Sequence, residues 1–157
     1  MPTVHLIHGY IGAGKTTFAK KLAEEVNGVR FNPDEWMVRL YGEDPPANQF
    51  AERLERVFAL LDDQWVRVVR CGVDVVLDYG FWTRGSRDEA RQRAALAGVP
   101  SRLYALQCSE TSARARCRQR NTDLQGSLYI ADNTFDVLKA RFEPLQPDEP
   151  YVAIVTE

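Results

Sequence analysis

Short apolar segments rich in β-branched residues alternate along the chain with longer stretches in which apolar residues recur every three or four positions. The short segments predict β-strands and the longer ones predict amphipathic helices. The predicted strands are Val4–Ile7, Gly28–Asn32, Val73–Tyr79, Arg102–Gln107 and Tyr151–Val155. Because helices separate the strands, we expect an α/β fold, with a parallel sheet, helices on both of its faces and right-handed crossovers.

The longest predicted helix carries one continuous apolar stripe and ends at Gly72. The stripe consists of Phe50, Leu54, Val57, Phe58, Leu61, Trp65 and Val68. The other helices are expected at Phe18–Val26, Pro33–Leu40, Ser86–Ala97, Ser109–Arg120 and Asn133–Phe142. In the helix before Ala97 we assign Ser86 as the N-cap, because Glu89 three residues later completes a capping box. The segment Asn121–Ser127 is predicted to be a mobile loop.

The segment between the first strand and the first helix fits the phosphate-binding pattern G-x-x-x-x-G-K-[ST], with Gly9, Gly14, Lys15 and Thr16 at its fixed positions. Glycines let backbone N–H groups approach a polyphosphate, and the start of a helix favours an anion. The lysine reaches the β- and γ-phosphates, and the threonine hydroxyl is a ligand for Mg²⁺. We therefore expect ATP and Mg²⁺ to bind this loop. The expected nucleotide-binding residues are Gly9, Gly12, Ala13, Gly14, Lys15, Thr16 and Thr17.

Two aspartates follow neighbouring strands at the edge of the sheet where ligands bind in such folds. Asp34 comes just after the second strand, and Asp78 ends the third. A carboxylate at this edge accepts the proton of an attacking hydroxyl or holds Mg²⁺. Spacing alone does not decide which aspartate does which. We favour Asp34 as the general base and assign Asp78, with Thr16, to the metal and the acceptor.

Four arginines lie on the helix that ends near Arg120. At helical spacing Arg116 and Arg120 share one face, and Arg114 and Arg118 share another. One pair is expected to form a solvated basic surface, and the other to close over the nucleotide. We assign Arg116 and Arg120 to the nucleotide, with Arg120 screening charge on the transferred phosphoryl group. This helix and the loop after it form a predicted lid over approximately residues 114–130.

Aromatic side chains follow both of the strands that lead into the aspartates. Trp36, Phe81 and Trp82 are expected to line an acceptor pocket, together with Arg39. Packing within the core or the loops is the alternative for the aromatic residues, and a solvated surface position is the alternative for the arginine.

Composition adds limits on location and partners. The chain has 157 residues, which fits a single domain over 1–157, and its net charge of −2 gives no general attraction to nucleic acid or to an anionic membrane. No apolar run reaches membrane-spanning length, and because the first residues lead directly into a strand we expect no signal peptide; the three cysteines are widely spaced. We therefore expect a cytoplasmic location. His5 and His8 fall on opposite faces of one strand, so we interpret both as structural.

Four motifs resemble those of small P-loop kinases of the polynucleotide 5′-hydroxyl kinase, zeta toxin and chloramphenicol phosphotransferase group, and of the stand-alone ATP-binding kinases allied to them. The motifs are Gly9–Thr17, Asn32–Asp34, Val76–Trp82 and Arg116–Asn121. The resemblance implies a three-layer P-loop NTPase fold with a five-stranded parallel sheet of order 2-3-1-4-5. It also implies that Asp34 is the general base, that Asp78 works beside the metal or acceptor, and that Arg120 and Arg116 contact ATP.

The sequence also departs from the polynucleotide kinases of this group. They carry an arginine three residues after the base to grip the phosphate of the nucleic acid, and this chain has Met37 there, with Arg39 displaced. Their further lid arginine is missing from Thr122–Gln125. We therefore predict an ATP- and Mg²⁺-dependent transfer of phosphate to a hydroxyl of a small molecule. A 5′-hydroxyl nucleic-acid kinase is the first alternative, and a nucleotide-dependent switch or slow ATPase without an acceptor is the second.

Overall fold

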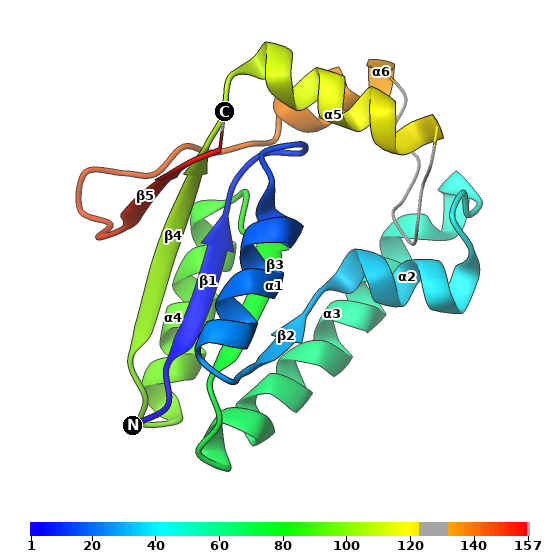
Figure 1. The fold of residues 1–157 in the computed structure, drawn as a ribbon. Helices are drawn as coiled ribbons and strands as arrows, with labels where there is room; N and C mark the ends of the chain where they lie inside the picture. The colour runs from blue at the N-terminus through cyan, green and yellow to red at the C-terminus, as the bar shows by residue number, and fades with distance from the viewer. Residues whose placement is uncertain (123–131, 157) are drawn as a thin grey trace.

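The computed structural model describes residues 1–122 and 132–156 (Figure 1). The strands are β1 (Val4–His8), β2 (Val29–Phe31), β3 (Val75–Gly80), β4 (Ser101–Gln107) and β5 (Val152–Val155). The helices are α1 (Lys15–Glu25), α2 (Pro33–Tyr41), α3 (Ala47–Arg70), α4 (Arg84–Leu96), α5 (Glu110–Thr122) and α6 (Asp132–Lys139). The strands form one parallel sheet of order β2-β3-β1-β4-β5, which confirms the predicted fold class.

Helices cover both faces of the sheet because consecutive strand residues point to opposite sides. In β1, Leu6 packs with the buried residues of α3 and α4, whereas Ile7 packs with Ala19 and Leu22 of α1 on the other face. The continuous apolar runs of the inner strands are explained by this double coverage. Figure 1 shows α5 and α6 lying across the carboxyl ends of the strands.

The apolar stripe of α3 divides into two parts with different surroundings. Its C-terminal part is fully buried in the core, through Val57, Leu61 and Trp65. Its N-terminal part is only half-buried, and Phe50 and Leu54 line a cavity instead. The hydrophobic stripe therefore predicted the helix correctly but did not reveal that one end of it faces a site.

The predicted start of α4 was wrong. The helix begins at Arg84, and Thr83 is its N-cap, accepting a hydrogen bond from the Ser86 backbone N–H at 3.1 Å. Thr83 and Ser86 are both capping residue types, and the actual cap lies at the earlier of the two positions. The predicted cap at Ser109 is confirmed by its hydrogen bond from Ser112 N–H. Helix α6 ends at Lys139, before the predicted Phe142.

The predicted loop and lid fall partly outside the described residues. Asn121 and Thr122 belong to α5, and residues 123–131 are not described. Both histidines are buried and hydrogen-bonded, in keeping with structural roles. His5 contacts Tyr104 and Asp74, and His8 contacts the Phe81 carbonyl. Among the described helices, none is long and apolar enough to cross a membrane.

Candidate active site

The loop between β1 and α1 adopts a conformation that only glycine accommodates at two positions. Gly12 has φ +79°, and Gly14, the N-cap of α1, has φ +89°. A Cβ at Gly12 would lie 2.3 Å from the carbonyl oxygen of Ala113 in α5. The missing side chain therefore lets α5 pack directly on the loop.

The loop and the start of α1 present backbone donors and one cation. Among the hydrogen bonds of the described residues, none is donated by the backbone N–H of Gly14, Lys15 or Thr16. N–H groups in a first helical turn have no partner in their own helix and are suited to bind an anion. Lys15 Nζ donates to the Tyr10 carbonyl at 2.8 Å. Burial lowers the pKa of Lys15, while the negative charges of Asp78 and Asp34 raise it.

Thr16 and Asp78 meet where α1 and β3 come together. The Thr16 hydroxyl donates to Asp78 Oδ2 at 2.9 Å, and the Asn32 amide donates to the same oxygen at 2.7 Å. Arg30 lies 3.4 Å from that oxygen and also forms a two-pronged ion pair with Glu35. These contacts fix the orientation of a carboxylate that is only 5% exposed.

The oxygen atoms of Thr16 and Asp78 fit a magnesium ion. Mg²⁺ prefers oxygen ligands and is usually held by one or two protein groups together with phosphates and water. A hydroxyl and a carboxylate beside a phosphate-binding loop supply such a set. Within the described part of the chain, no group of three or more His, Cys, Asp or Glu side chains forms a denser metal site.

Asp34 lies in the first turn of α2 and opens into the cavity that also contains Lys15 and Asp78. Its carboxylate makes no hydrogen bond with any described residue. Burial among the walls of this cavity raises the pKa of Asp34; the charges of Lys15 and Arg120 lower it, and Asp78 raises it further. Asp34 is exposed, and it lines the open cavity.

Arg116 and Arg120, the pair assigned to the nucleotide from the sequence, line the same cavity from α5. Arg116 donates to the carbonyl of Gly12 at 3.1 Å and to the carbonyl of Thr156, so it ties the loop to the end of β5. Arg120 is near enough to act electrostatically on Lys15 and Asp34. Arg114, by contrast, pairs with Glu110 and Asp136 away from this cavity.

The cavity has a volume of about 910 Å³ and brings most of the predicted site residues together. From the phosphate-binding loop and α1 it includes Gly12, Gly14, Lys15, Thr16 and Thr17, and from the other elements Asp34, Asp78, Phe81, Trp82, Arg116 and Arg120. Gly9 and Ala13 support the loop without lining the cavity. Trp36 and Arg39 also lie outside the lining and are exposed on α2.

Comparison with known proteins agrees with this arrangement. A family model described as "AAA domain" matches residues 4–145. The chain belongs to this AAA domain family. It is a family of P-loop kinases. A search of curated proteins gave no match.

Solved structures resemble the AAA domain over almost its whole length. A candidate kinase from Chloroflexus aurantiacus has a TM-score of 0.78 at 13% identity, covering 98% of this chain and 88% of its own. Kti12 from Chaetomium thermophilum, solved with ADP-AlF3, has a TM-score of 0.72 at 19% identity, and the match covers 97% of this chain and 88% of the Kti12 chain. A gluconokinase from Sinorhizobium meliloti has a TM-score of 0.66 at 18% identity, and the match covers 98% of this chain and 82% of the gluconokinase chain. At these identities the likeness shows the fold.

The lining residues of the AAA domain that were not predicted as site residues include three apolar side chains of one helix. Phe50, Leu54 and Phe58 project from α3 into the cavity. Their spacing is the same as that of the core residues that follow, so the sequence pattern does not separate the two groups. The missing signal is tertiary: the first turns of α3 extend beyond the sheet (Figure 1).

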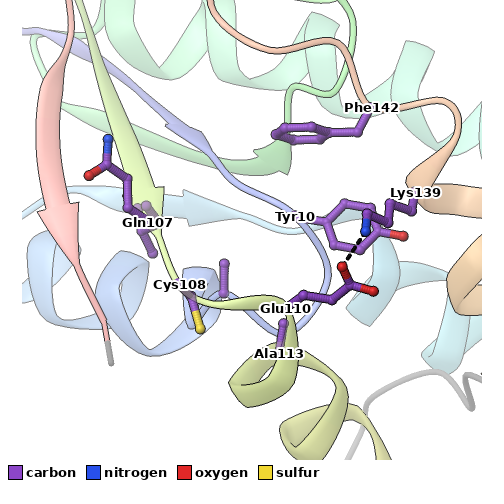
Figure 2. Close-up of a pocket in the computed structure, with 9 residues that line it drawn as sticks. Tyr10, Gln107, Cys108, Glu110, Ala113, Lys139 and Phe142 are labelled. Carbon is purple, nitrogen blue, oxygen red and sulfur yellow. Dashed lines mark hydrogen bonds and ion pairs between the residues drawn. The ribbon is translucent and has the colours of Figure 1, made fainter.

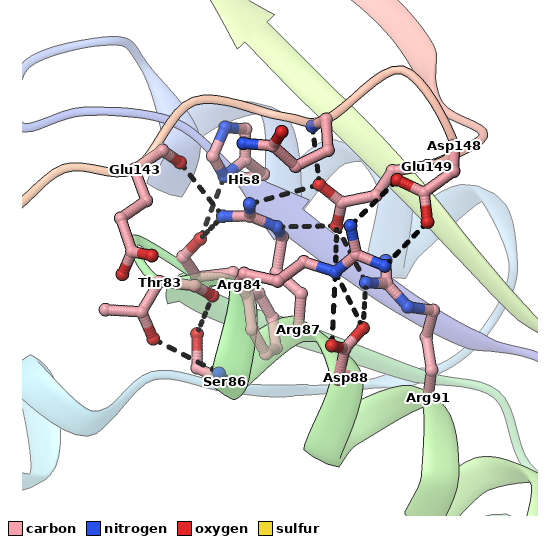
Figure 3. Close-up of polar contacts among 12 residues, drawn as sticks. His8, Thr83, Arg84, Ser86, Arg87, Asp88, Arg91, Glu143, Asp148 and Glu149 are labelled. Atoms are coloured by element: carbon pink, nitrogen blue, oxygen red, sulfur yellow. Dashed lines mark hydrogen bonds and ion pairs between the residues drawn. The ribbon is translucent and has the colours of Figure 1, made fainter.

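A buried ion pair behind the site was also missed. Arg87 of α4 is fully buried and contacts Glu149 at 2.8 Å and the Phe81 carbonyl at 2.9 Å (Figure 3). Arg84 of the same helix pairs with Asp88 and Asp148, so its guanidinium is engaged on the surface. This network anchors the segment after β3, where Phe81 has a φ of +49°. Arginines within α4 gave no sequence signal that one of them is buried.

A second, smaller cavity of about 350 Å³ lies beside the phosphate-binding loop (Figure 2). Tyr10, Ala13 and Phe142 contribute to its lining, and the ion pair between Glu110 and Lys139 lies at one side. Both charged groups are neutralised by each other. The AAA domain therefore concentrates its candidate chemistry in the larger cavity.

Proposed function

We propose that this protein transfers the γ-phosphate of ATP, with Mg²⁺, to a hydroxyl group of a small molecule. The observation that carries the proposal is the carboxylate of Asp34, which has no hydrogen bond to a described residue and shares one cavity with the phosphate-binding loop. A switch that only binds a nucleotide has no need of a proton acceptor in such a cavity, and in a slow ATPase a water molecule would stand in place of the acceptor hydroxyl. The P-loop kinase family and its fold support the same reaction class.

In the proposed step, Asp34 accepts the proton of the acceptor hydroxyl. The acceptor oxygen forms a bond to the γ-phosphorus, and the bond from that phosphorus to the β–γ bridging oxygen breaks, so that ADP leaves. Lys15 and the backbone N–H groups of Gly14 and Thr16 hold the β- and γ-phosphates. Such catalysis depends mainly on positioning and on electrostatic stabilisation.

Two further groups balance charge during transfer. Thr16 and Asp78 would hold Mg²⁺, which neutralises negative charge on the phosphate oxygens when it is bound. Arg120 lines the cavity from α5 and interacts electrostatically with Lys15 and Asp34. It is therefore suited to stabilise negative charge on the phosphoryl group during transfer. Arg116, held against the loop at Gly12, would contact the bound nucleotide.

The test is phosphate transfer from radiolabelled ATP to a panel of hydroxyl compounds, measured for three variants. We expect Lys15→Ala to abolish turnover. Asp34→Asn should reduce transfer by about 10²- to 10⁴-fold, the usual contribution of a general base, with ATP affinity nearly intact. Asp44→Asn, an exposed aspartate beyond α2, is the matched control and should behave as wild type. Full activity of Asp34→Asn with a true acceptor would show that Asp34 is not the base.

A further inference from the structure

We propose that the acceptor is an alcohol with an apolar, aromatic body and without a phosphate or carboxylate group. This inference rests on the proposed function, because it assigns the part of the cavity that the nucleotide would leave open. A volume of about 910 Å³ is at the upper end of the range for a single ligand, about 300–1,000 Å³, so the nucleotide leaves room for a small molecule.

One wall of the cavity is apolar. Its side chains come from the start of α3 and from the end of β3 with the segment after it. They are Phe50, Leu54, Phe58, Tyr79, Phe81 and Trp82. Tyr79 links two of these rings: Phe58 meets it edge to face at 5.0 Å between centroids, and Phe81 stacks on it at 5.3 Å. An aromatic ligand gains both buried apolar area and favourable ring contacts on such a surface.

The polar atoms of these aromatic residues are already used inside the protein. The Tyr79 hydroxyl donates to Asp62 at 3.0 Å, and Trp82 Nε1 donates to the Gly9 carbonyl at 3.1 Å. A sugar or other polyol on this wall would bury hydroxyl groups without partners, at a cost of roughly 1–3 kcal/mol for each group. The wall therefore disfavours polyhydroxylated acceptors.

The neighbouring hydroxyl side chains are engaged as well. Thr83 Oγ1 accepts the hydrogen bond that caps α4, and the Ser86 hydroxyl donates to the Thr83 carbonyl at 2.8 Å. Asp34 is then the polar group beside this wall that has no hydrogen bond to a described residue. A single hydroxyl on an otherwise apolar molecule is enough to satisfy it.

The positions of the charged side chains in the cavity also favour an uncharged acceptor. The cations that line the cavity within the described chain belong to the loop, α1, or the α5–α6 side. They are Lys15, Lys20, Arg116, Arg120 and Arg141. The aromatic wall has none of them, and Asp34 and Glu35 lie next to it. Glu35 is paired with Arg30, so an anionic acceptor would meet the Asp34 carboxylate without an opposing cation on the wall, which disfavours sugar phosphates, sugar acids and nucleic acid.

The test compares acceptors of matched size with Mg·ATP and the whole protein. The panel contains 2-phenylethanol and 3-phenyl-1-propanol as aromatic alcohols, glycerol and gluconate as polar acceptors, and a 5′-hydroxyl oligothymidylate. Binding of each compound in the presence of an ATP analogue is measured by calorimetry alongside transfer. We expect kcat/KM for the phenyl alcohols to exceed that for glycerol and gluconate by at least about tenfold.

Two variants locate the effect on the wall. Leu54→Lys places a cation there and should lower kcat/KM for the phenyl alcohols by about tenfold or more while leaving nucleotide affinity unchanged. Leu60→Lys is the control, because Leu60 is 45% exposed on the same helix and does not line the cavity. Phe58→Leu is a milder change that provides a second test if the lysine variant misfolds. It should also lower kcat/KM for the phenyl alcohols.

The outcomes separate the two proposals. Faster transfer to a polar or nucleic-acid acceptor would overturn the aromatic assignment and leave the kinase function standing. Binding of the phenyl alcohols that depends on Leu54 but leads to no transfer would support the assignment and count against phosphotransfer. If the phenyl alcohols neither bind nor react while ATP binds, the aromatic assignment is wrong.

Discussion

At the scale of single residues, the raised pKa of Asp34 follows from its position in the first turn of α2 at the cavity, and not from hydrogen bonds to neighbouring described residues. Asn32 caps the helix through the Glu35 N–H and also holds Asp78, so the two residues flanking Pro33 have separate tasks. Asn32 fixes the start of α2 and the orientation of the Asp78 carboxylate. The other, Asp34, lines the cavity and has no hydrogen bond to a described residue, and we expect pH to act on this carboxylate.

The pH dependence of transfer should report the raised pKa of Asp34. A general base works only when it is deprotonated, so kcat/KM should fall as pH decreases through that pKa. Because burial raises the pKa above 3.8, we expect this fall at a higher pH than for an ordinary aspartate. The measurement is kcat/KM from pH 4 to 9 at saturating Mg·ATP. A rate that stays constant down to the ordinary range of an aspartate would rule this out.

The ionisation of Asp34 should affect the stability of the fold in the direction opposite to its effect on transfer: the ionised form that transfer requires is the less stable one. A folded-state pKa above the unfolded one means that the folded protein binds more protons between the two values, so the ionised carboxylate lowers the stability at neutral pH. Asp34→Asn is therefore expected to melt at a slightly higher temperature than wild type at pH 7. The difference should shrink as pH falls toward about 4. If the ionised carboxylate of Asp34 stabilised the fold instead, Asp34→Asn would melt at a lower temperature than wild type at pH 7.

Gly12 gives a second prediction at this scale. In Gly12→Ala the new Cβ meets the Ala113 carbonyl oxygen at 2.3 Å, and the φ of +79° adds strain of about 1–3 kcal/mol. We expect a lower melting temperature and at least tenfold weaker nucleotide binding, because α5 must move away from the loop. Gly85→Ala is the control: nothing lies within 4 Å of its Cβ position, and alanine favours the helix by about 0.5–1 kcal/mol. Equal effects of the two changes would contradict this explanation.

At the scale of elements, α4 is joined to the C-terminal segment by the buried pair of Arg87 and Glu149. Arg91 also contacts this carboxylate, at 2.7 Å, and Gln146 N–H donates to it at 2.8 Å. Burial alone would raise the pKa of Glu149, but the hydrogen bonds from Arg87, Gln146 and Arg91 outweigh it and lower the pKa to about 2. The same guanidinium of Arg87 holds the Phe81 carbonyl, so this pair links fold stability to the wall of the cavity.

Glu149→Gln tests that link. A folded-state pKa of about 2 against 4.5 corresponds to about 3 kcal/mol of stability, present above pH 4.5 and lost as pH falls toward 2. We expect the variant to lose about 3–5 kcal/mol at pH 7, the usual cost of breaking a buried pair, and to depend less on pH over that window. The measurement is urea unfolding between pH 2.5 and 7. Glu89→Gln, which breaks an exposed pair with Arg93 on the same helix, should cost under about 0.5 kcal/mol.

Elements and loop chemistry were predictable from sequence where a local pattern determines them. The five strands, the long α3 and the phosphate-binding loop were found because period and motif are local properties. Asp34 and Asp78 were predicted to lie at one edge because parallel strands end there, and both line the same cavity. Phe81 and Trp82 of the aromatic wall were predicted to line a pocket, but the part from α3 was not, because Phe50 to Phe58 continue the core stripe without a break. The pairing of Arg87 with Glu149 joins positions 62 residues apart, and no local pattern encodes it.

At the scale of the whole molecule, the cavity is assembled from segments distant in sequence that meet only in the folded chain. Thr16 and Asp78 are 62 positions apart, and Arg116 is 104 positions from the Gly12 carbonyl that it contacts. A ligand that needs all of these groups binds the folded state alone. Binding should therefore stabilise the entire domain and not only its loop.

This coupling is measurable as a shift in melting temperature. At 100 times its dissociation constant, a magnesium-bound, non-hydrolysable ATP analogue should add about 2.7 kcal/mol, which for a domain of this size corresponds to roughly 5–11 °C. The same analogue with EDTA should give a smaller shift, because Thr16 and Asp78 then lack the cation that joins them to the phosphates. In Asp78→Asn the difference between the magnesium and EDTA measurements should largely disappear, whereas in Asp44→Asn it should persist. An equal shift with and without magnesium in the wild type would mean that these two side chains do not form the metal site, and that the phosphates are held by the loop alone.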